Sequence, residues 1–128
     1  MPLVRIALRA GTPPADQRMI ADGVHQALVE TISVPAADRF QLISEYAAGN
    51  LIYDPSYLNI SRTDQLVILQ ITISLGRTAE QKRALYRRIV ELLAERPGIR
   101  PEDVFINLVE VAKENWSFGQ GIAQYALE

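Results

Sequence analysis

Pro2, the second residue, is the one whose type and place most directly suggest chemistry. Removal of Met1 would leave Pro2 with a free secondary amine. Such an amine can take a proton from carbon or return one to it, and it can form an iminium with a carbonyl. A free α-amine has a pKa of roughly 7.7–8.0; apolar surroundings lower that pKa, and a nearby carboxylate raises it. The alternative is that proline is merely tolerated at this position.

Other residue types that often carry chemistry are absent or have simpler interpretations. The chain has no cysteine, which excludes thiolate metal sites, cysteine nucleophiles and disulfides. The one histidine, His25, falls on a mixed face in the middle of an expected helix. The sequence Gly119-Gln120-Gly121 lacks the lysine and the capped helix of a phosphate loop, so we expect a turn. No group of His, Asp and Glu residues has metal-ligand spacing, and we expect neither a metal nor a cofactor.

Composition limits the possible classes of protein. The 128 residues are 48% apolar and 22% charged, which is typical of one globular domain. Thirteen basic and fifteen acidic residues give a net charge of -2, which argues against a nucleic-acid partner. The longest apolar runs are about five residues, against the roughly 20 that span a bilayer, so we expect no membrane segment. The first residues lack the pattern of a signal peptide, and we expect a cytoplasmic protein.

The chain matches itself at an offset of 65 residues, from about residue 3 to residue 47. We interpret the match as two copies of one supersecondary unit within a single domain, residues 1–128. Copy one covers about residues 2–48, a connection 49–65, copy two about 66–113 and a tail 114–128. The identical pairs are Ile6/Ile71, Gly11/Gly76, Arg18/Arg83, Leu28/Leu93, Glu30/Glu95, Asp38/Asp103, Phe40/Phe105 and Glu45/Glu110.

Each copy has the pattern of a strand, a helix and a second strand. Short runs of branched residues predict strands at 3–8, 40–45, 67–73 and 104–110. Strand, helix and strand in about 45 residues form a βαβ unit, whose two strands run parallel. The two copies therefore predict an α+β fold, with a four-stranded sheet and two helices on one face. The other face also carries Ile and Val, and we expect it to bury against another subunit.

Helix boundaries are predicted from capping residues. Thr12 followed by Pro13 predicts a capped start for the first helix. Thr78 with Gln81 predicts a capping box at the start of the second helix. We expect the first helix to end near Ser33, and the second near the Pro97-Gly98 pair.

Several features together resemble the tautomerase superfamily. Within it, the chain is most similar to the group of malonate semialdehyde decarboxylase and the related long-chain 4-oxalocrotonate tautomerase-like proteins. The resemblance implies a tautomerase-like β-α-β fold and a homotrimer with an amino-terminal proline at each active site. It rests on the Met-Pro start, the doubled βαβ unit, Gly76-Arg77-Thr78, Asp103-Val104-Phe105-Ile106 and Asn115-Trp116-Ser117-Phe118-Gly119.

The resemblance also implies roles for two charged residues. Asp38 falls where the decarboxylase has an acidic residue that activates water or holds the proton of the proline. Asp103 occupies the same turn in copy two, so an aspartate there could instead accept backbone N–H bonds. Arg77 falls on an arginine that grips a substrate carboxylate through two parallel bonds. The alternative for Arg77 is a solvated charge near a helix start.

The resemblance places an apolar wall around the site and includes one departure. Trp116, Phe118 and Tyr125 fall on the wall, where they would exclude water; the alternative is that they pack a subunit contact. A second arginine of the decarboxylase falls on Leu75, which cannot bind a carboxylate. This substrate-pocket position therefore argues against decarboxylation. The arginines left to replace it are Arg5, Arg9 and Arg62.

We therefore expect a cofactor-independent tautomerase. In it, Pro2 moves a proton between carbon and the enol oxygen of a small oxo acid, with Arg77 and Asp38 assisting. Decarboxylation of malonate semialdehyde is the alternative within the superfamily. From another class, the alternative is a non-catalytic trimeric binding protein on the same scaffold. Retention of Met1 would favour it, because an acylated proline nitrogen is neither base nor nucleophile.

Overall fold

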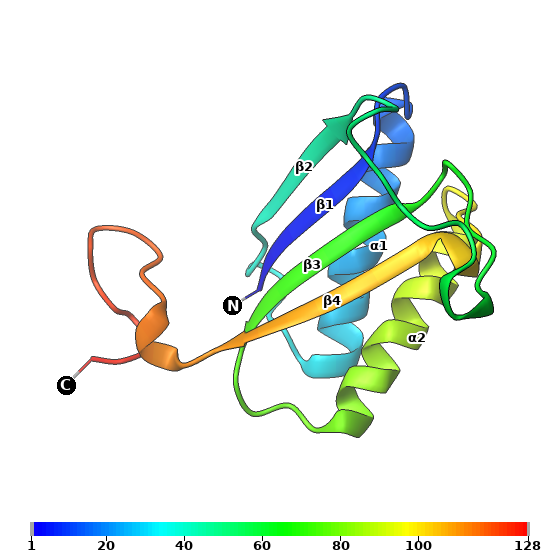
Figure 1. The fold of residues 1–128 in the computed structure, drawn as a ribbon. Coiled ribbons are helices and arrows are strands. Elements are labelled where there is room, and N and C mark those ends of the chain that lie inside the picture. The colour runs from blue at the N-terminus through cyan, green and yellow to red at the C-terminus, as the bar shows by residue number, and fades with distance from the viewer. Residues whose placement is uncertain (1, 128) are drawn as a thin grey trace.

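The computed structural model describes residues 2–127. Met1 and Glu128 lie outside the described residues, and so does the question of whether Met1 is removed. Strands and helices follow one another in the order that the repeat predicts (Figure 1). The elements are β1 (Leu3–Arg9), α1 (Pro14–Ile32), β2 (Gln41–Tyr46), β3 (Val67–Ser74), α2 (Ala79–Glu95) and β4 (Val104–Val111).

The sheet has the strand order β2-β1-β3-β4. β1 pairs with β2 in parallel and β3 pairs with β4 in parallel, whereas the central strands β1 and β3 run antiparallel. Both helices lie on the same face of the sheet (Figure 1). The predicted tandem βαβ fold is therefore confirmed. Because the copies meet antiparallel, the starts of β1 and β2 lie beside the ends of β3 and β4. We call the end of the sheet where β1 and β2 begin the proline end, and the end where β1 and β2 finish the distal end.

The core lies between the sheet and the two helices. Side chains alternate between the two faces of a strand, so every second residue of β1 and β3 points towards the helices, and these residues are the buried ones. Gly23 lets α1 approach α2, since a Cβ there would lie 2.9 Å from Cδ1 of Leu93. Each fully buried aliphatic side chain contributes about 1.5–3 kcal/mol. The largest such side chains include Ile6, Leu8, Ile20, Leu28, Leu69, Ile71, Ile73, Leu85, Ile89 and Leu93.

The face of the sheet away from the helices is open in the single chain. It exposes Leu42, Phe105 and Val109, whose exposed fractions are 48%, 47% and 36%. A polar pair interrupts this apolar surface, because Nε2 of Gln70 donates to Oδ1 of Asn107 at 3.2 Å. An exposed apolar sheet face of this kind is typical of a surface that other protein covers.

The two helices begin differently. The predicted capping box of α2 is confirmed: the Gln81 N–H donates to Oγ1 of Thr78 at 3.1 Å, and the Thr78 N–H donates to Oε1 of Gln81 at 2.9 Å. The predicted Thr12 cap is wrong. The hydroxyl of Thr12 donates back to the carbonyl of Arg9 at 2.9 Å, and Pro13 occupies the N-cap position without a side-chain cap. Two consecutive prolines move the start of α1 to Pro14.

Two observations bear on expected absences. Among residues 2–127, neither helix is long and apolar enough to cross a membrane. Within the same described range, no cluster of three or more His, Asp or Glu side chains could hold a metal ion.

His25 lies against the chain that follows α1, with Nε2 2.9 Å from the carbonyl of Ala36. This contact joins α1 to the turn before β2.

Candidate active site

A cavity of about 430 Å³ opens at the proline end of the sheet. Pro2 is buried, and its place immediately before β1 fixes it at the start of a central strand. β3 and the end of β4 supply the neighbouring wall, and the tail after β4 supplies the rest. We call it the proline cavity. Its lining residues are Pro2, Leu3, Phe40, Thr72, Val111, Asn115, Trp116, Ser117 and Phe118.

Aromatic side chains form the apolar wall of the proline cavity. Trp116 stacks on Phe118, with ring centroids 5.3 Å apart and ring planes 9° apart. Tyr125 meets Phe118 edge-on at 4.8 Å, so it supports the wall from behind without lining the cavity. All three rings belong to the tail, which projects beyond the sheet from the end of β4 (Figure 1). Such aromatic pairs add about 0.5–1.5 kcal/mol each beyond the area that they bury.

Hydrogen bonds hold the tail in position over the strand ends. The indole N–H of Trp116 donates to Oγ of Ser74 at 3.0 Å, and Ser74 is buried at the end of β3. Further along, Gln124 closes the tail into a loop. Its Oε1 accepts the N–H of Phe118 at 2.9 Å, and its Nε2 donates to the carbonyl of Gly119 at 3.0 Å. The wall is thus fixed by polar contacts as well as by ring packing.

Phe40 is a wall residue that sequence reasoning missed. Its ring centroid lies 6.3 Å from that of Phe118, and its carbonyl accepts the N–H of Val4 at 3.0 Å. That backbone bond holds the start of β2 beside the start of β1. The sequence pattern places Phe40 inside a strand, whereas β2 begins at Gln41. The signal available in the sequence was its position at the start of the predicted strand 40–45, which pairs in parallel with the strand that follows Pro2.

Arg77 lies at the proline end but does not line the proline cavity. It follows β3, is half-buried, and its Nη2 donates to the carbonyl of Ile32 at the end of α1, at 3.1 Å. A guanidinium has five N–H donors, so this one bond leaves others for a ligand. Leu75 lies at the same end, is 59% exposed, and its backbone N–H donates to the carbonyl of Val111 at 3.0 Å.

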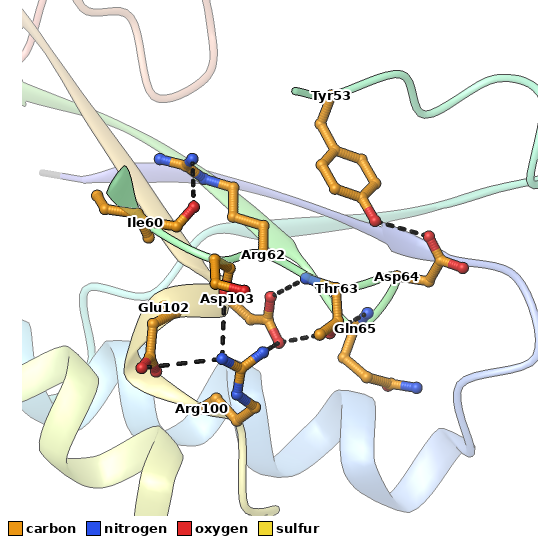
Figure 2. A network of polar contacts seen from close by, with 10 residues as sticks. Tyr53, Ile60, Arg62, Thr63, Asp64, Gln65, Arg100, Glu102 and Asp103 are labelled. Atoms are coloured by element: carbon orange, nitrogen blue, oxygen red, sulfur yellow. Dashed lines mark hydrogen bonds and ion pairs between the residues drawn. The ribbon is translucent and has the colours of Figure 1, made fainter. Parts of the chain in front are cut away.

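The two matching aspartates have different surroundings. Asp103 is fully buried, and its carboxylate accepts the N–H of Thr63 at 2.7 Å and the hydroxyl of Thr63 at 2.6 Å (Figure 2). Arg100 donates to the same carboxylate at 3.4 Å. Asp38 is only half-buried in the turn before β2, at the proline end, where its backbone N–H donates to the carbonyl of Pro35 at 3.0 Å. Asp103 therefore has the backbone-binding role that was the alternative for Asp38.

The three arginines that could replace the missing one lie elsewhere. Arg9 ends β1 and so belongs to the distal end. Arg62 uses its Nη1 to donate to the carbonyls of Tyr57 and Ile60, at 2.9 and 3.2 Å. Arg5 is exposed in the middle of β1 and is paired in register with Gln70 of β3. Over residues 2–127, the proline cavity is lined by no cationic side chain.

Comparisons of sequence identify the family. A family profile described as "Tautomerase enzyme" matches residues 38–119, and a second of the same description matches residues 2–60. Probable tautomerase YusQ of Bacillus subtilis (strain 168) is 44% identical over 124 residues, which are 97% of this chain and 98% of that protein. Probable tautomerase YrdN of the same organism is 35% identical over 125 residues, 98% of this chain and 96% of that protein.

Comparisons of structure agree with them. FG41 malonate semialdehyde decarboxylase, solved with 3-bromopropiolate as inhibitor, is 40% identical and superimposes with a TM-score of 0.90, covering 96% of this chain and 93% of its own. A malonate semialdehyde decarboxylase solved in wild-type, mutant and inactivated forms is 33% identical, also with a TM-score of 0.90, covering 96% and 95%. The symmetric trimer of a fused 4-OT protein, at 22% identity and a TM-score of 0.76 over 94% of each chain, shares the fold. The chain is therefore a member of the tautomerase superfamily of enzymes.

Proposed function

We propose that this enzyme is a cofactor-independent tautomerase, in which the amine of Pro2 moves a proton on a small oxo acid. The observation that carries the proposal is the position of Pro2, buried at the start of a central strand in a cavity with an aromatic wall. An apolar wall disfavours a charged amine, so it increases the share of the free base that accepts a proton. Strand pairing on both sides of β1 keeps the amine fixed.

The proton transfer has two steps. The nitrogen of Pro2 takes the enol O–H proton, and the C=O bond forms as the electrons of the C=C bond move towards carbon. The same nitrogen then delivers the proton to that carbon, which gives the keto acid and the free amine. The rings of Trp116 and Phe118 exclude water and shape the space around the substrate, and Tyr125 supports the ring of Phe118. Leu75 lies at the same end of the sheet, outside the lining of the cavity.

Arg77 and Asp38 assist in this proposal. Arg77 grips the substrate carboxylate with the N–H groups that its bond to Ile32 leaves available. Because Arg77 does not line the cavity, the carboxylate points out of it, towards the turn between β3 and α2. Asp38 stands in the turn before β2, where a carboxylate stabilises the protonated amine of Pro2. The observation that supports both roles is that Arg77 and Asp38 lie at the same end of the sheet as Pro2.

The test is enol–keto exchange of phenylpyruvate, followed by absorbance. Pro2→Ala should lower kcat/KM by about 10²-fold or more, the usual contribution of a positioned base. The matched control is Pro13→Ala, which makes the same change at an exposed proline of the α1 start and should leave kcat/KM unchanged. Intact mass must show that Met1 is absent from the active protein. Full activity in Pro2→Ala, or in protein that retains Met1, would disprove the role of Pro2.

Decarboxylation of malonate semialdehyde is the second candidate, favoured by the 40% identity to FG41 malonate semialdehyde decarboxylase. Here the protonated Pro2 polarises the aldehyde carbonyl; alternatively, the free amine of Pro2 adds to that carbonyl and water leaves, which gives an iminium. The bond to the carboxylate then breaks, CO₂ leaves, and a proton reaches the remaining carbon. The leucine at position 75 weighs against this reaction because it supplies no charge. Leu75→Arg should raise decarboxylation, since Leu75 is exposed and has room for a longer side chain; an unchanged rate would count against the reasoning.

We also propose that the enzyme works as a homotrimer, with the open sheet face as the interface. The exposed side chains of Leu42, Phe105 and Val109 support this, as does the trimeric state of the fused 4-OT protein. Sedimentation analysis should give three times the chain mass of 14.3 kDa. Phe105→Glu should dissociate the assembly, whereas Gln26→Glu on the exposed surface of α1 should leave it intact. A monomer at working concentration would refute this part of the proposal.

A further inference from the structure

A second, smaller cavity opens at the distal end of the sheet. Its volume is about 110 Å³, which suits a ligand of a few non-hydrogen atoms. The end of β1 contributes Arg9, the end of β2 contributes Tyr46, and the connection between the copies contributes Leu51, Tyr53 and Asp64. We call it the distal cavity. It shares no lining residue with the proline cavity.

The internal repeat relates the two cavities. Within the repeat, the offset of 65 residues carries Tyr46 onto Val111; continued past the end of the match, it carries Leu51 and Tyr53 of the connection onto Trp116 and Phe118 of the tail. The first member of each pair lines the distal cavity and the second lines the proline cavity. Because β1 and β3 run antiparallel, corresponding parts of the two copies lie at opposite ends of the sheet. The distal cavity is therefore the counterpart, in the other copy, of the candidate active site.

The chemistry of the two cavities differs. Val67 stands in copy two where copy one has Pro2, and a residue inside the chain has no free amine. In place of the amine and the aromatic wall, the distal cavity has a cation, two phenols and a carboxylate. Arg9 is the last residue of β1, and the strand fixes its backbone at the cavity. Among residues 2–127, its guanidinium has no hydrogen-bonding partner. Such a group can bind a ligand carboxylate through two parallel bonds.

The opposite wall of the distal cavity is held in place. The hydroxyl of Tyr53 donates to Oδ1 of Asp64 at 2.8 Å (Figure 2). This bond to the Asp64 carboxylate raises the pKa of Tyr53, so the phenol keeps its proton at neutral pH. The residue before Asp64 is Thr63, which donates two hydrogen bonds to the fully buried Asp103. Asp64 is thus fixed next to an anchored backbone, and its second oxygen can accept a bond from a ligand.

We propose that the distal cavity is a ligand-binding site for a small carboxylic acid that also carries a hydrogen-bond donor, either a hydroxyl or an ammonium group. The guanidinium of Arg9 binds the carboxylate of the ligand. The carboxylate of Asp64 accepts a hydrogen bond from the hydroxyl or ammonium group of the ligand, and an ammonium group also offsets the negative charge of Asp64. The site holds its ligand without transforming it, because it contains no counterpart of the amine of Pro2.

Ligand-observed NMR titration of the full chain tests the site. L-lactate should bind more tightly than propionate, which has the same carboxylate without the hydroxyl. Arg9→Gln should weaken L-lactate binding by about tenfold, the loss expected for a charge-assisted contact. The matched control is Arg5→Gln, which changes another exposed arginine of the same strand outside both cavities and should bind as the wild type does. If neither L-lactate nor L-alanine binds, or if the one that binds does so equally well to Arg9→Gln, the proposal is overturned.

Asp64→Ala tests the second contact. This variant should bind L-lactate and propionate equally, because the acceptor for the hydroxyl is gone. A preserved preference for L-lactate would contradict the assignment of Asp64. L-alanine distinguishes the two donors: tighter binding than L-lactate identifies an ammonium ligand, and weaker binding a hydroxy acid.

Measuring the catalytic activity of the variants tests the distal site separately from the proposed function. Arg9→Gln should retain the phenylpyruvate activity of the wild type within about twofold, since Arg9 lies at the opposite end of the sheet from Pro2. A loss of activity in Arg9→Gln would mean that Arg9 serves the catalytic site of a neighbouring copy, which overturns a separate distal site. Loss of activity only in Pro2→Ala leaves the distal site intact, and inactivity of the wild type would refute the proposed function alone.

Discussion

The two ends of the sheet come from one repeated unit and carry different chemistry. At the proline end, Pro2 meets an apolar wall of tail residues that includes Trp116. At the distal end, Arg9 and Asp64 face a smaller cavity, and the buried Asp103 anchors the connection beside it. Between the two ends, the strands and helices of the two copies follow one another in the same order.

The difference follows from where a chain can have a free amine. A copy at the start of a chain can present an amine on its first strand, but a copy inside the chain presents only an amide nitrogen. Val67 therefore cannot replace Pro2 whatever its surroundings. The buried frame tolerates little change because both copies share one core, whereas residues at the strand ends are free to diverge. Catalysis based on an amine is thus confined to one end.

The largest expected effect separates the matching aspartates. Asp103→Asn should lower the free energy of unfolding by about 3 kcal/mol, because the buried amide keeps one acceptor oxygen for the two donors of Thr63 and places an NH₂ group against the other donor. Asp38→Asn should cost less stability than Asp103→Asn, because Asp38 is half-buried and Asp103 is fully buried, and it should lower kcat/KM for phenylpyruvate by about tenfold. Denaturant titration and enzyme kinetics of both variants check this. Equal stability losses would remove the contrast, and full activity in Asp38→Asn would exclude Asp38 from the chemistry.

A smaller effect is expected at Ser74, whose counterpart at the distal end is Arg9. Ser74→Ala removes the acceptor of the Trp116 indole, so kcat/KM should fall about fivefold as the wall loosens, equivalent to about 1 kcal/mol. Ser74→Thr keeps the hydroxyl and should restore most of the rate. Steady-state kinetics decide between the two, and equal rates in Ala and Thr variants would show that the bond does not position the ring.

The helix starts provide a third contrast between the copies. Thr78→Ala should destabilise the protein by about 1 kcal/mol, because it removes the side-chain cap of α2. Thr12→Ala should cost less, since the hydroxyl of Thr12 bonds to Arg9 and not to α1. Thermal unfolding of the two variants measures the difference. A loss at Thr12 as large as that at Thr78 would mean that Thr12 supports α1 by another route.

The smallest effect concerns an ion pair present only in copy one. Hydrogen bonding from Arg39 holds the pKa of Asp22 below its ordinary value. A lowered pKa stabilises the fold above the unfolded-state pKa, and that stability is lost as pH falls below about 4. Solvent screening keeps the contribution under about 1 kcal/mol. Asp22→Asn should therefore reduce the melting temperature slightly at neutral pH and not at pH values near 2, whereas a uniform reduction would indicate another cause.

Much of the fold could be predicted because the repeat is carried by local patterns. Strand and helix positions follow from hydrophobic period and capping residues, and the box of Thr78 and Gln81 is correct in detail. The prediction of a Thr12 cap was wrong because the hydroxyl of Thr12 donates to the backbone carbonyl of Arg9 and does not accept from the N–H groups of α1. The antiparallel pairing of β1 with β3 depends on how the long connection returns, which no local pattern records.

The candidate site was less predictable. The bond from Arg77 to Ile32 joins residues 45 positions apart, and the ring of Phe40 meets Phe118 of the tail across the whole sheet. Such contacts exist only after the strands have paired. The family resemblance indicated Pro2, Trp116 and Phe118, which line one cavity. Their part in catalysis remains a prediction for the variants above.

Trp116 is the only tryptophan of the chain. Its indole stacks on Phe118 in the wall of the proline cavity and is bound to Ser74. Excitation at the long-wavelength edge of the absorption band selects the indole of a tryptophan over the phenol rings of the tyrosines. The intrinsic fluorescence of the protein therefore reports from the cavity of Pro2. We expect a molecule that enters this cavity to change the emission, and a molecule that binds beside Arg9, at the opposite end of the sheet, to change it far less.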